Sequence, residues 1–429
     1  MAARLSRSNR ARHPKKRAFS APMRILILGI NFTPELTGIG KYTGELVQFL
    51  TRQGHLVHMV TAPPYYPHWR VADGYRAWVY RKELIDGAQV IRCPLWVPRH
   101  PRGFTRLLHL ASFALSSFPI MLAQARWKPQ LVFCVAPAIA SAPSAWLLAR
   151  LSGGKAWLHI QDFELDAALQ LKMLPGLGWA RHLLQRLERL LLHRFDLVSS
   201  ISPRMISHLE SKGVSRETSY LFENWVDCSQ IFPHSRLTSL RSQWGFTQNT
   251  SVVLYSGSMG QKQGLESLIE SARIVQNEPT IQFVLCGDGA ARTSLQQQAA
   301  DLKNVHFYPL VPFDQLNELL NTADIHVLTQ HQGAADLVMP SKLSAMLASG
   351  RPVIATALPG TGLAEVVLQT GLLVPPENPS ALANAIHQLS SQPDLRQELA
   401  QRGRSFALDH WNKPTVLNSW MHAVESLCL

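Results

Sequence analysis

The feature that most constrains the fold of this chain is a pair of glycine turns within residues 251–289. Each turn follows a short apolar run, 251–255 or 281–286, and precedes a segment with helical spacing of apolar residues. Runs that alternate in this way predict consecutive βα units of a parallel sheet. The carboxyl ends of such strands border a crevice in which phosphorylated ligands bind against the first turns of the helices.

The residues in the two turns suit a phosphate group. Gly257 and Gly287 permit close approach of the backbone, and Lys262, in the loop after the first strand, adds a positive charge. A glycine at a βα corner can also serve packing alone. The two turns together with the lysine favour a nucleotide or nucleotide-sugar site.

Strand-like runs alternate with amphipathic segments along the chain, which predicts an α/β fold of two doubly wound, Rossmann-like domains facing a central cleft. A polar connector follows residues 222–227, which we take as the domain junction. We expect an N-terminal domain at 23–225, a C-terminal domain at 226–405 and a helix at 406–429 that packs back over the junction. The predicted strands are 24–30, 55–62, 89–94, 130–136, 155–160, 197–201, 219–222, 251–255, 281–286, 305–308, 325–329, 352–355 and 371–374.

Residues 1–22 carry seven Arg or Lys, no acidic residue and no apolar segment typical of a signal peptide. We expect a disordered basic tail here, or a true start at Met23. Without these seven charges the net charge of +13 falls to +6, and no basic surface with interleaved aromatics is evident, so we expect no nucleic-acid partner. Five scattered cysteines lack the spacing of a disulfide framework or a zinc site, which indicates a reducing, cytoplasmic compartment.

The most apolar segment, residues 107–123, is shorter than a membrane span and contains His109 and Pro119. Arginine and lysine residues flank it on both sides, at positions 99, 102, 106, 126 and 128. Two interpretations remain open: a helix in the protein core, or an apolar surface that lies on the anionic inner leaflet of a membrane. In the second, we expect Leu110 and Phe113 to face the lipid.

Two segments of the first half carry candidate site residues. Gly38 and Gly40 follow the first strand, where a flexible loop could place N–H groups near a phosphate. Asp162 follows the strand at 155–160 and could orient or deprotonate an acceptor hydroxyl, or could simply cap a helix. His159, inside that strand, is expected to be a core histidine.

The second half adds a helix start and a strand end. Ser341 and Lys342 begin a predicted helix, where a lysine beside free N–H groups would bind a diphosphate. Asp336 lies in the loop before this helix. The strand at 305–308 runs into a segment with two prolines around Leu310, whose exposed backbone could contact a nucleobase edge.

The chain from Met23 onward resembles the retaining glycosyltransferases of family 4, which have the GT-B fold. The resemblance rests on ordered motifs, and its first half is most similar to the transferases of enterobacterial colanic acid exopolysaccharide synthesis. It implies a GDP-fucose donor, a polyprenyl-pyrophosphate-linked saccharide acceptor, retention of anomeric configuration, and no metal or cofactor. The motifs are PELTGIGKYT, TAPPYYPHW, RCPLWVP, LHIQDFELDA, FENWVD, LYSGSMGQKQGLESLIE, CGDGAARTSL, VHFYPLVP and MPSKLSAMLASGRPVIA.

The resemblance also implies roles for particular residues. Lys262 and Lys342 match the family's basic ligands of the donor diphosphate, and Asp336 matches the first of its paired glutamates. The second glutamate is Ser344 here, the usual arginine after the strand glycine is Ser258, and the usual histidine before Asp162 is Gln161. We expect catalytic roles for Asp162 and Asp336. The expected donor-binding residues are Gly38, Gly40, Gly257, Lys262, Gly287, Leu310, Ser341 and Lys342, and the expected acceptor-binding residues are Tyr65, Tyr66 and Trp69.

Two other functions fit the same architecture. A nucleotide-sugar 2-epimerase would share the phosphate crevice but would need neither the apolar segment nor an acceptor groove. A non-catalytic subunit that binds a nucleotide sugar is the other alternative, since Ser344 and Ser258 replace functional residues of the family. We therefore expect a cytoplasmic transferase at the inner face of the membrane, with these two functions as alternatives.

Overall fold

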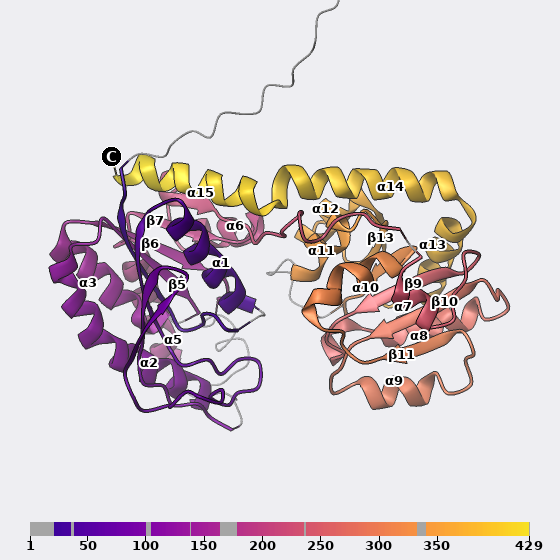
Figure 1. The fold of residues 1–429 in the computed structure, drawn as a ribbon, viewed down its shortest axis with the longest axis horizontal. Helices are drawn as coiled ribbons and strands as arrows, with labels where there is room; N and C mark the ends of the chain where they lie inside the picture. The colour runs from indigo at the N-terminus through magenta and orange to yellow at the C-terminus, as the bar shows by residue number, and fades with distance from the viewer. Residues whose placement is uncertain are drawn as a thin grey trace, which may run out of the picture.

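The computed structural model describes residues 21–35, 38–99, 104–137, 139–163, 178–235, 237–332 and 340–428. Two lobes lie side by side, each built on one sheet (Figure 1). Within the described residues, the N-terminal sheet has eight strands in the order β3-β4-β2-β1-β5-β6-β7-β8, and the C-terminal sheet has six in the order β11-β10-β9-β12-β13-β14. The predicted fold class, with two Rossmann-like α/β domains, is confirmed.

The N-terminal sheet contains one strand that the sequence analysis missed. β3 runs antiparallel to β4 at the edge of the sheet, and the two are joined by Asp86-Gly87. Both turn residues have positive φ, as a two-residue hairpin turn requires, so the Asp-Gly pair was an available signal. The strands are β1 Arg24–Gly29, β2 Leu56–Thr61, β3 Arg81–Ile85, β4 Ala88–Arg92, β5 Leu131–Ala136, β6 Lys155–Ile160, β7 Leu197–Ser200 and β8 Ser219–Leu221.

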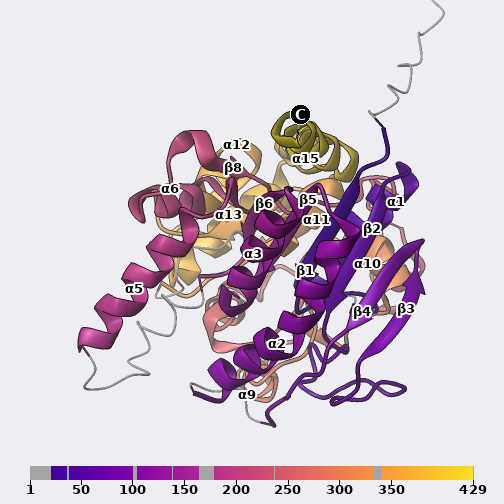
Figure 2. The same ribbon diagram turned by 90° about the vertical axis from the view of Figure 1, so that its left-hand side faces the viewer.

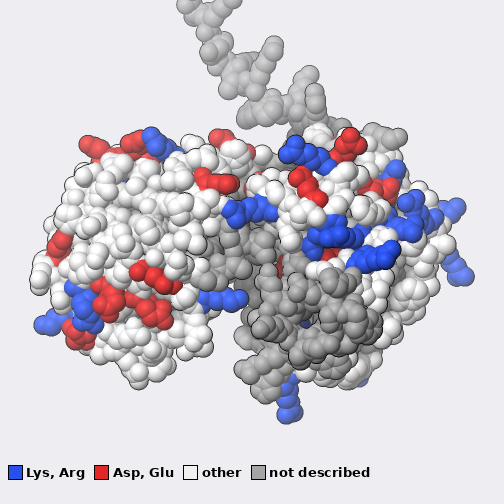
Figure 3. Space-filling model, turned by 180° about the vertical axis from the view of Figure 1, so that it is seen from behind, with Lys and Arg blue, Asp and Glu red and all other residues white. Residues whose placement is uncertain are grey.

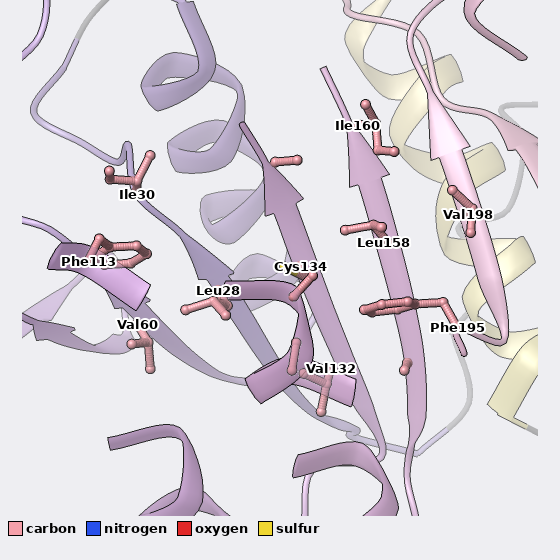
Figure 4. Packing of buried hydrophobic residues seen from close by; sticks show 14 of the residues in the cluster. Leu28, Ile30, Val60, Phe113, Val132, Cys134, Leu158, Ile160, Phe195 and Val198 are labelled. Carbon is pink, nitrogen blue, oxygen red and sulfur yellow. The ribbon is translucent and has the colours of Figure 1, made fainter. Parts of the chain in front are cut away.

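The central strands of this sheet are buried on both faces because their apolar residues alternate in direction. On β1, Leu26 and Leu28 join the cluster that includes residues of α2 and α3, whereas Ile25 and Ile27 join the cluster under α1. Figure 4 shows Leu28 in the first cluster together with Phe113 of α2, and Figure 2 shows α2 and α3 in front of the strands. The helices are α1 Gly38–Arg52, α2 Phe104–Ala123, α3 Ala142–Ser152, α5 Gly178–Leu192 and α6 Pro203–Ser211.

The C-terminal sheet is parallel throughout its described pairs and is covered in the same way. Val253, Phe283 and Ile325 pack toward α8 and α13, and Leu254 and Val284 pack toward the opposite cluster. The strands are β9 Ser251–Ser256, β10 Ile281–Cys286, β11 Val305–Tyr308, β12 Ile325–Leu328, β13 Val353–Thr356 and β14 Leu372–Val374. The helices are α7 Ser239–Gln243, α8 Glu266–Ile274, α9 Arg292–Gln298, α10 Leu316–Thr322, α11 Ser341–Ala348, α12 Gly362–Thr370, α13 Pro379–Ser391 and α14 Pro393–Phe406.

The chain returns to the N-terminal lobe through its last helix, α15 Lys413–Cys428. Figure 1 shows α14 and α15 running along one side of both lobes. Trp420 of α15 is fully buried, and its ring centroid lies 5.2 Å from that of Phe133 on β5 and 5.5 Å from that of Phe222. The last helix therefore completes the core of the lobe from which the chain began.

The apolar segment at 107–123 lies in α2, whose two faces differ. Leu110 and Phe113 are 7 % and 0 % exposed, so the expectation that they face lipid is wrong. The opposite side exposes Leu108, Leu115 and Phe118, at 43 %, 77 % and 42 %. The helix is therefore a core helix on one side and exposes apolar side chains on the other, and contact of that side with a membrane stays a prediction.

Candidate active site

Both sheets reverse their strand order next to a predicted glycine turn. In the C-terminal sheet the order reverses between β9 and β12, and in the N-terminal sheet it reverses between β1 and β5. Ligands of open α/β sheets bind outside the carboxyl ends of the strands at such switch points. Gly257 follows β9, Lys342 follows β12, and Gly38 follows β1. The topology thus places predicted residues from both lobes at the two positions where a crevice forms.

Gly257 and Lys342 are in direct contact at the C-terminal switch point. Gly257 has a φ of +127°, and a Cβ there would lie 2.9 Å from both Cε and Nζ of Lys342. The Lys342 ammonium donates a hydrogen bond of 2.8 Å to the Tyr255 hydroxyl and lies 4.2 Å from the centroid of its ring. The Tyr255 hydroxyl in turn donates to the Ser258 carbonyl. The missing side chain of Gly257 therefore makes room for the lysine.

The environment of Lys342 favours its neutral form. Burial lowers the pKa of this lysine from 10.5 to about 8. Within the described parts of the chain, no carboxylate lies within 4 Å of its ammonium group. Pro340, the N-cap of α11, makes no side-chain hydrogen bond to the start of the helix. A buried cation beside an uncapped helix start is suited to an anion, since both features favour negative charge.

The other predicted donor residues surround this position at the strand ends. A Cβ on Gly287 would lie 1.9 Å from the Gly257 carbonyl oxygen, so Gly287 is required by packing between two loops. Lys262 is exposed in a 3-10 helix, Gln261–Gln263, and its carbonyl accepts a hydrogen bond from His331 N, which joins the loops after β9 and β12. Leu310 is 61 % exposed just after β11. Asp336 lies outside the described residues.

The first glycine turn of the N-terminal lobe is organised by a carboxylate that sequence reasoning missed. Glu35 is 5 % exposed and accepts hydrogen bonds from the backbone N–H groups of Tyr65 and Tyr66, at 2.9 and 3.0 Å, and from Asn31. Burial raises its pKa. A Cβ on Gly40 would lie 2.7 Å from Glu35, so this glycine admits the carboxylate. Glu35 thus ties the loop after β1 to the loop after β2.

The three aromatic residues expected to bind the acceptor differ in exposure. Tyr65 is 6 % exposed and packs against Trp69 and His109, with ring centroids at 5.5 and 4.8 Å. Tyr66 is 42 % exposed, and its ring lies 3.6 Å from the Cβ position of Gly38. Tyr66 is therefore the more accessible of the two tyrosines, and Tyr65 supports the loop from within the core.

Asp162 lies just beyond β6 with about half of its side chain exposed, and its carboxylate is 3.9 Å from the guanidinium of Arg106 on α2. The segment that follows, 164–177, is outside the described residues, so its interpretation as a helix cap stays a prediction. His159 is fully buried as expected, contacts the Ser199 hydroxyl at 2.9 Å, and has its pKa lowered to about 3 by burial. It is therefore a neutral core residue.

The two lobes meet at a small pocket of about 30 Å³ beside the start of α11. Ser341 and Ser344 line it from the C-terminal lobe, and Ser202 and Glu223 line it from the N-terminal lobe. Glu223 accepts a hydrogen bond from Trp411 Nε1, and burial raises its pKa. A carboxyl group with a raised pKa in an interlobe pocket is a functional candidate that the sequence analysis did not identify.

A larger cavity than this pocket lies elsewhere in the C-terminal lobe. It holds about 510 Å³ and lies at the opposite edge of the C-terminal sheet, beside Asp324 and Pro352, which precede β12 and β13. Arg396 and Arg404, which line it, donate to the last carbonyls of α13 and α11. These arginines stabilise helix ends. The volume of a cavity therefore does not by itself identify the ligand site, because ligands of this fold bind at the carboxyl ends of the strands.

Charge is distributed unequally between the lobes on the face that Figure 3 shows, where basic side chains gather over the N-terminal lobe.

Among the described residues, no group of three His, Cys, Asp or Glu side chains could hold a metal ion. The expectation of a metal-independent reaction stays a prediction.

Comparisons with known proteins identify the family of the chain. Residues 37–225 match the family model "Glycosyl transferase 4-like domain", and residues 250–392 match "Glycosyl transferases group 1". An Escherichia coli protein named as a colanic acid biosynthesis glycosyl transferase, WcaI, is 44 % identical over 395 residues, which are 89 % of this chain and 96 % of that protein.

Solved structures show the same fold at low sequence identity. Sucrose-phosphate synthase from Thermosynechococcus elongatus superimposes with a TM-score of 0.71 at 18 % identity, covering 94 % of this chain and 99 % of that one. Anabaena HepE in complex with UDP-glucose gives a TM-score of 0.65 at 17 % identity, covering 94 % and 100 %. The two domain models, the extended identity and the fold agree, and the chain belongs to the GT-B glycosyltransferases of family 4.

Proposed function

We propose that this chain transfers fucose from GDP-fucose to a polyprenyl-pyrophosphate-linked saccharide in the biosynthesis of a colanic acid-like exopolysaccharide, with retention of anomeric configuration. The supporting comparison is the 44 % identity, over almost its whole length, to a protein named for colanic acid biosynthesis. The resemblance of the sequence motifs to that group of transferases supports the donor and the acceptor.

The observation that carries the transfer reaction is the contact between Lys342 and Gly257. Departure of a nucleoside diphosphate builds negative charge, which fixed cations and N–H groups stabilise in the transition state. Lys342 supplies a cation at the start of α11, and Gly257, which has no side chain, leaves the space that this lysine occupies. Lys262 and Ser341 are exposed at the same strand ends and complete the proposed diphosphate site.

The acceptor is proposed to bind on the N-terminal lobe. Asp162 is accessible beyond β6 and is proposed to orient or deprotonate the acceptor hydroxyl. Tyr66, exposed beside the glycine turn at Gly38, offers a ring on which a sugar can stack. Asp336 is proposed to contact the donor sugar on the grounds of its place in the family motif.

The protein is proposed to rest on the inner face of the cytoplasmic membrane through the exposed side of α2. The segment Thr105–Trp127 is long and apolar enough to cross a membrane. Of the apolar stretch within this segment, 28 % is buried inside the protein. Because Phe113 of the same helix is fully buried against the sheet, we propose that α2 lies in the interface and does not span it. Leu115 and Phe118 would enter the interface, and Arg106 and Arg126 would meet anionic headgroups.

The experiment is mass spectrometry of the glycolipid formed when the purified protein receives a polyprenyl-pyrophosphate-linked saccharide and each of a panel of nucleotide sugars. Transfer of deoxyhexose from GDP-fucose, undiminished by a chelator, is the expected result. Conversion of a sugar nucleotide without acceptor would identify an epimerase. Nucleotide binding without any turnover would identify a non-catalytic subunit.

A further inference from the structure

A second cavity, of about 230 Å³, lies beside the free edge of the N-terminal sheet and has no part in the proposed transfer site. We call it the arginine pocket, because Arg76, Arg81 and Arg92 line it. Pockets for drug-sized ligands are typically about 300–1,000 Å³, so this cavity fits a single small group better than a nucleotide sugar. We propose that the arginine pocket binds the terminal phosphate of an anionic membrane lipid. The inference rests on the proposed membrane association.

The charges in the pocket do not cancel. Glu83 accepts from Arg81 at 2.8 Å and from Arg92 at 2.6 Å, so one carboxylate serves two guanidinium groups, and Arg76 brings a third. Glu35 also interacts electrostatically with Arg92, so the three arginines outnumber the two carboxyl groups around them by one. A phosphate monoester carries about −1.5 to −2 at neutral pH, whereas a phosphodiester carries one negative charge. An excess of positive charge among arginines suits a terminal phosphate, which carries more negative charge than a phosphodiester.

The fold holds two of the three guanidinium groups in place, those of Arg92 and Arg81. Arg92 is 1 % exposed and donates to the carbonyls of Ala62 and Thr33, beyond β2 and β1. Arg81 donates to the Gly74 carbonyl. The Tyr75 ring is near both arginines, with its centroid 4.8 Å from the guanidinium carbon of Arg92 and 5.0 Å from that of Arg81. Arginines fixed in this way suit a phosphate, because little side-chain freedom remains to be lost on binding.

The rim of the pocket is apolar and continuous with the exposed side of α2. Val79 and Tyr80 line the pocket and are 48 % and 47 % exposed, and Trp78 beside them is 69 % exposed. The Tyr80 hydroxyl donates to the Ser116 carbonyl of α2, which places the rim next to Leu115. Tryptophan and tyrosine favour the headgroup level of a bilayer. A basic cavity with this rim is suited to a phosphate presented by a membrane and not by solution.

The test compares binding to phosphatidylcholine vesicles that contain phosphatidate or phosphatidylglycerol, adjusted to equal surface charge. Wild-type protein should bind the phosphatidate vesicles roughly tenfold more tightly, since a charge-assisted contact is worth about 1.5–3 kcal/mol. The variant Arg76→Gln/Arg81→Gln should lose this preference and keep its melting temperature, because both side chains are at the surface. Arg92 is left intact because it holds two loops together.

The matched control is Arg150→Gln/Arg216→Gln, which removes the same charge from exposed positions elsewhere on the lobe. It should weaken binding to both vesicles equally. Equal binding of the wild type to the two lipids, or a preference that survives in the pocket variant, would overturn the proposal. Tight binding of soluble glycerol 3-phosphate without vesicle binding would also overturn it. Nucleoside diphosphate titrations report separately on the proposed transfer site, so failure of that function is distinguishable.

Discussion

Replacement of Lys342 by methionine should reveal a proton that is taken up when the donor binds. Burial lowers the pKa of this lysine from 10.5 to about 8, which corresponds to roughly 3 kcal/mol against the charged form. A diphosphate beside the ammonium raises this pKa again. The nucleotide therefore binds at constant affinity below about pH 8, and its affinity falls toward tenfold per pH unit above that value.

Isothermal titration calorimetry of a nucleoside diphosphate, in buffers of different ionisation enthalpy, measures the nucleotide affinity and the number of protons taken up on binding. At about pH 9 the wild-type protein should take up close to one proton on binding. Lys342→Met should take up none and should bind roughly tenfold to hundredfold more weakly at neutral pH, because a charge-assisted contact is lost. Turnover should fall further than affinity, since the leaving group gains charge in the transition state.

The same substitution should weaken nucleotide binding but stabilise the ligand-free protein. The pKa in the folded protein lies below that of the unfolded chain, so the charged lysine destabilises the fold below about pH 8, and stability rises as the pH increases from there toward 10.5. Lys342→Met should therefore raise the melting temperature at neutral pH without ligand. Lys303→Met, at an exposed lysine of the same lobe, is the control. Unchanged affinity and an unchanged pH profile in Lys342→Met would refute the reasoning.

Three further outcomes are expected. Lys262→Ala should weaken nucleotide binding tenfold or more, measured by calorimetry, and leave the melting temperature unchanged, because the side chain is exposed. Asp162→Asn should lower sugar transfer by about two orders of magnitude or more in a glycolipid assay with unchanged nucleotide affinity; weaker nucleotide binding would count against an acceptor role. Leu115→Glu/Phe118→Glu should release the protein from anionic vesicles in sedimentation and leave it folded, whereas Phe113→Glu should unfold it; retention of the surface variant would argue against the α2 interface.

The order of strands and helices followed from the apolar pattern, since buried parallel strands are short continuous runs. β3 was not predicted because its sequence, Arg-Lys-Glu-Leu-Ile, is as polar as that of a loop. The residues on the exposed face of α2 were assigned wrongly for a different reason. Its sequence is apolar almost all round, and only the position of the sheet decides that Phe113 is buried and Leu115 exposed. Contacts between distant residues, such as Glu35 with the loop after β2, leave no local pattern to detect.

The glycines of the proposed donor site are required by packing at this sheet edge. Gly287 is required because the Gly257 carbonyl occupies the space of its side chain, and Gly257 is required because Lys342 occupies the space of its own. The loop-to-loop packing thus creates the gap in which the lysine is buried against Tyr255. The family resemblance implies an arginine where this chain has Ser258, and the backbone carbonyl at this position accepts a hydrogen bond from the Tyr255 hydroxyl. Lys342 and Lys262 are proposed to supply positive charge at this sheet edge, and above about pH 8 a proton on Lys342 is the charge that the site gains when a diphosphate enters.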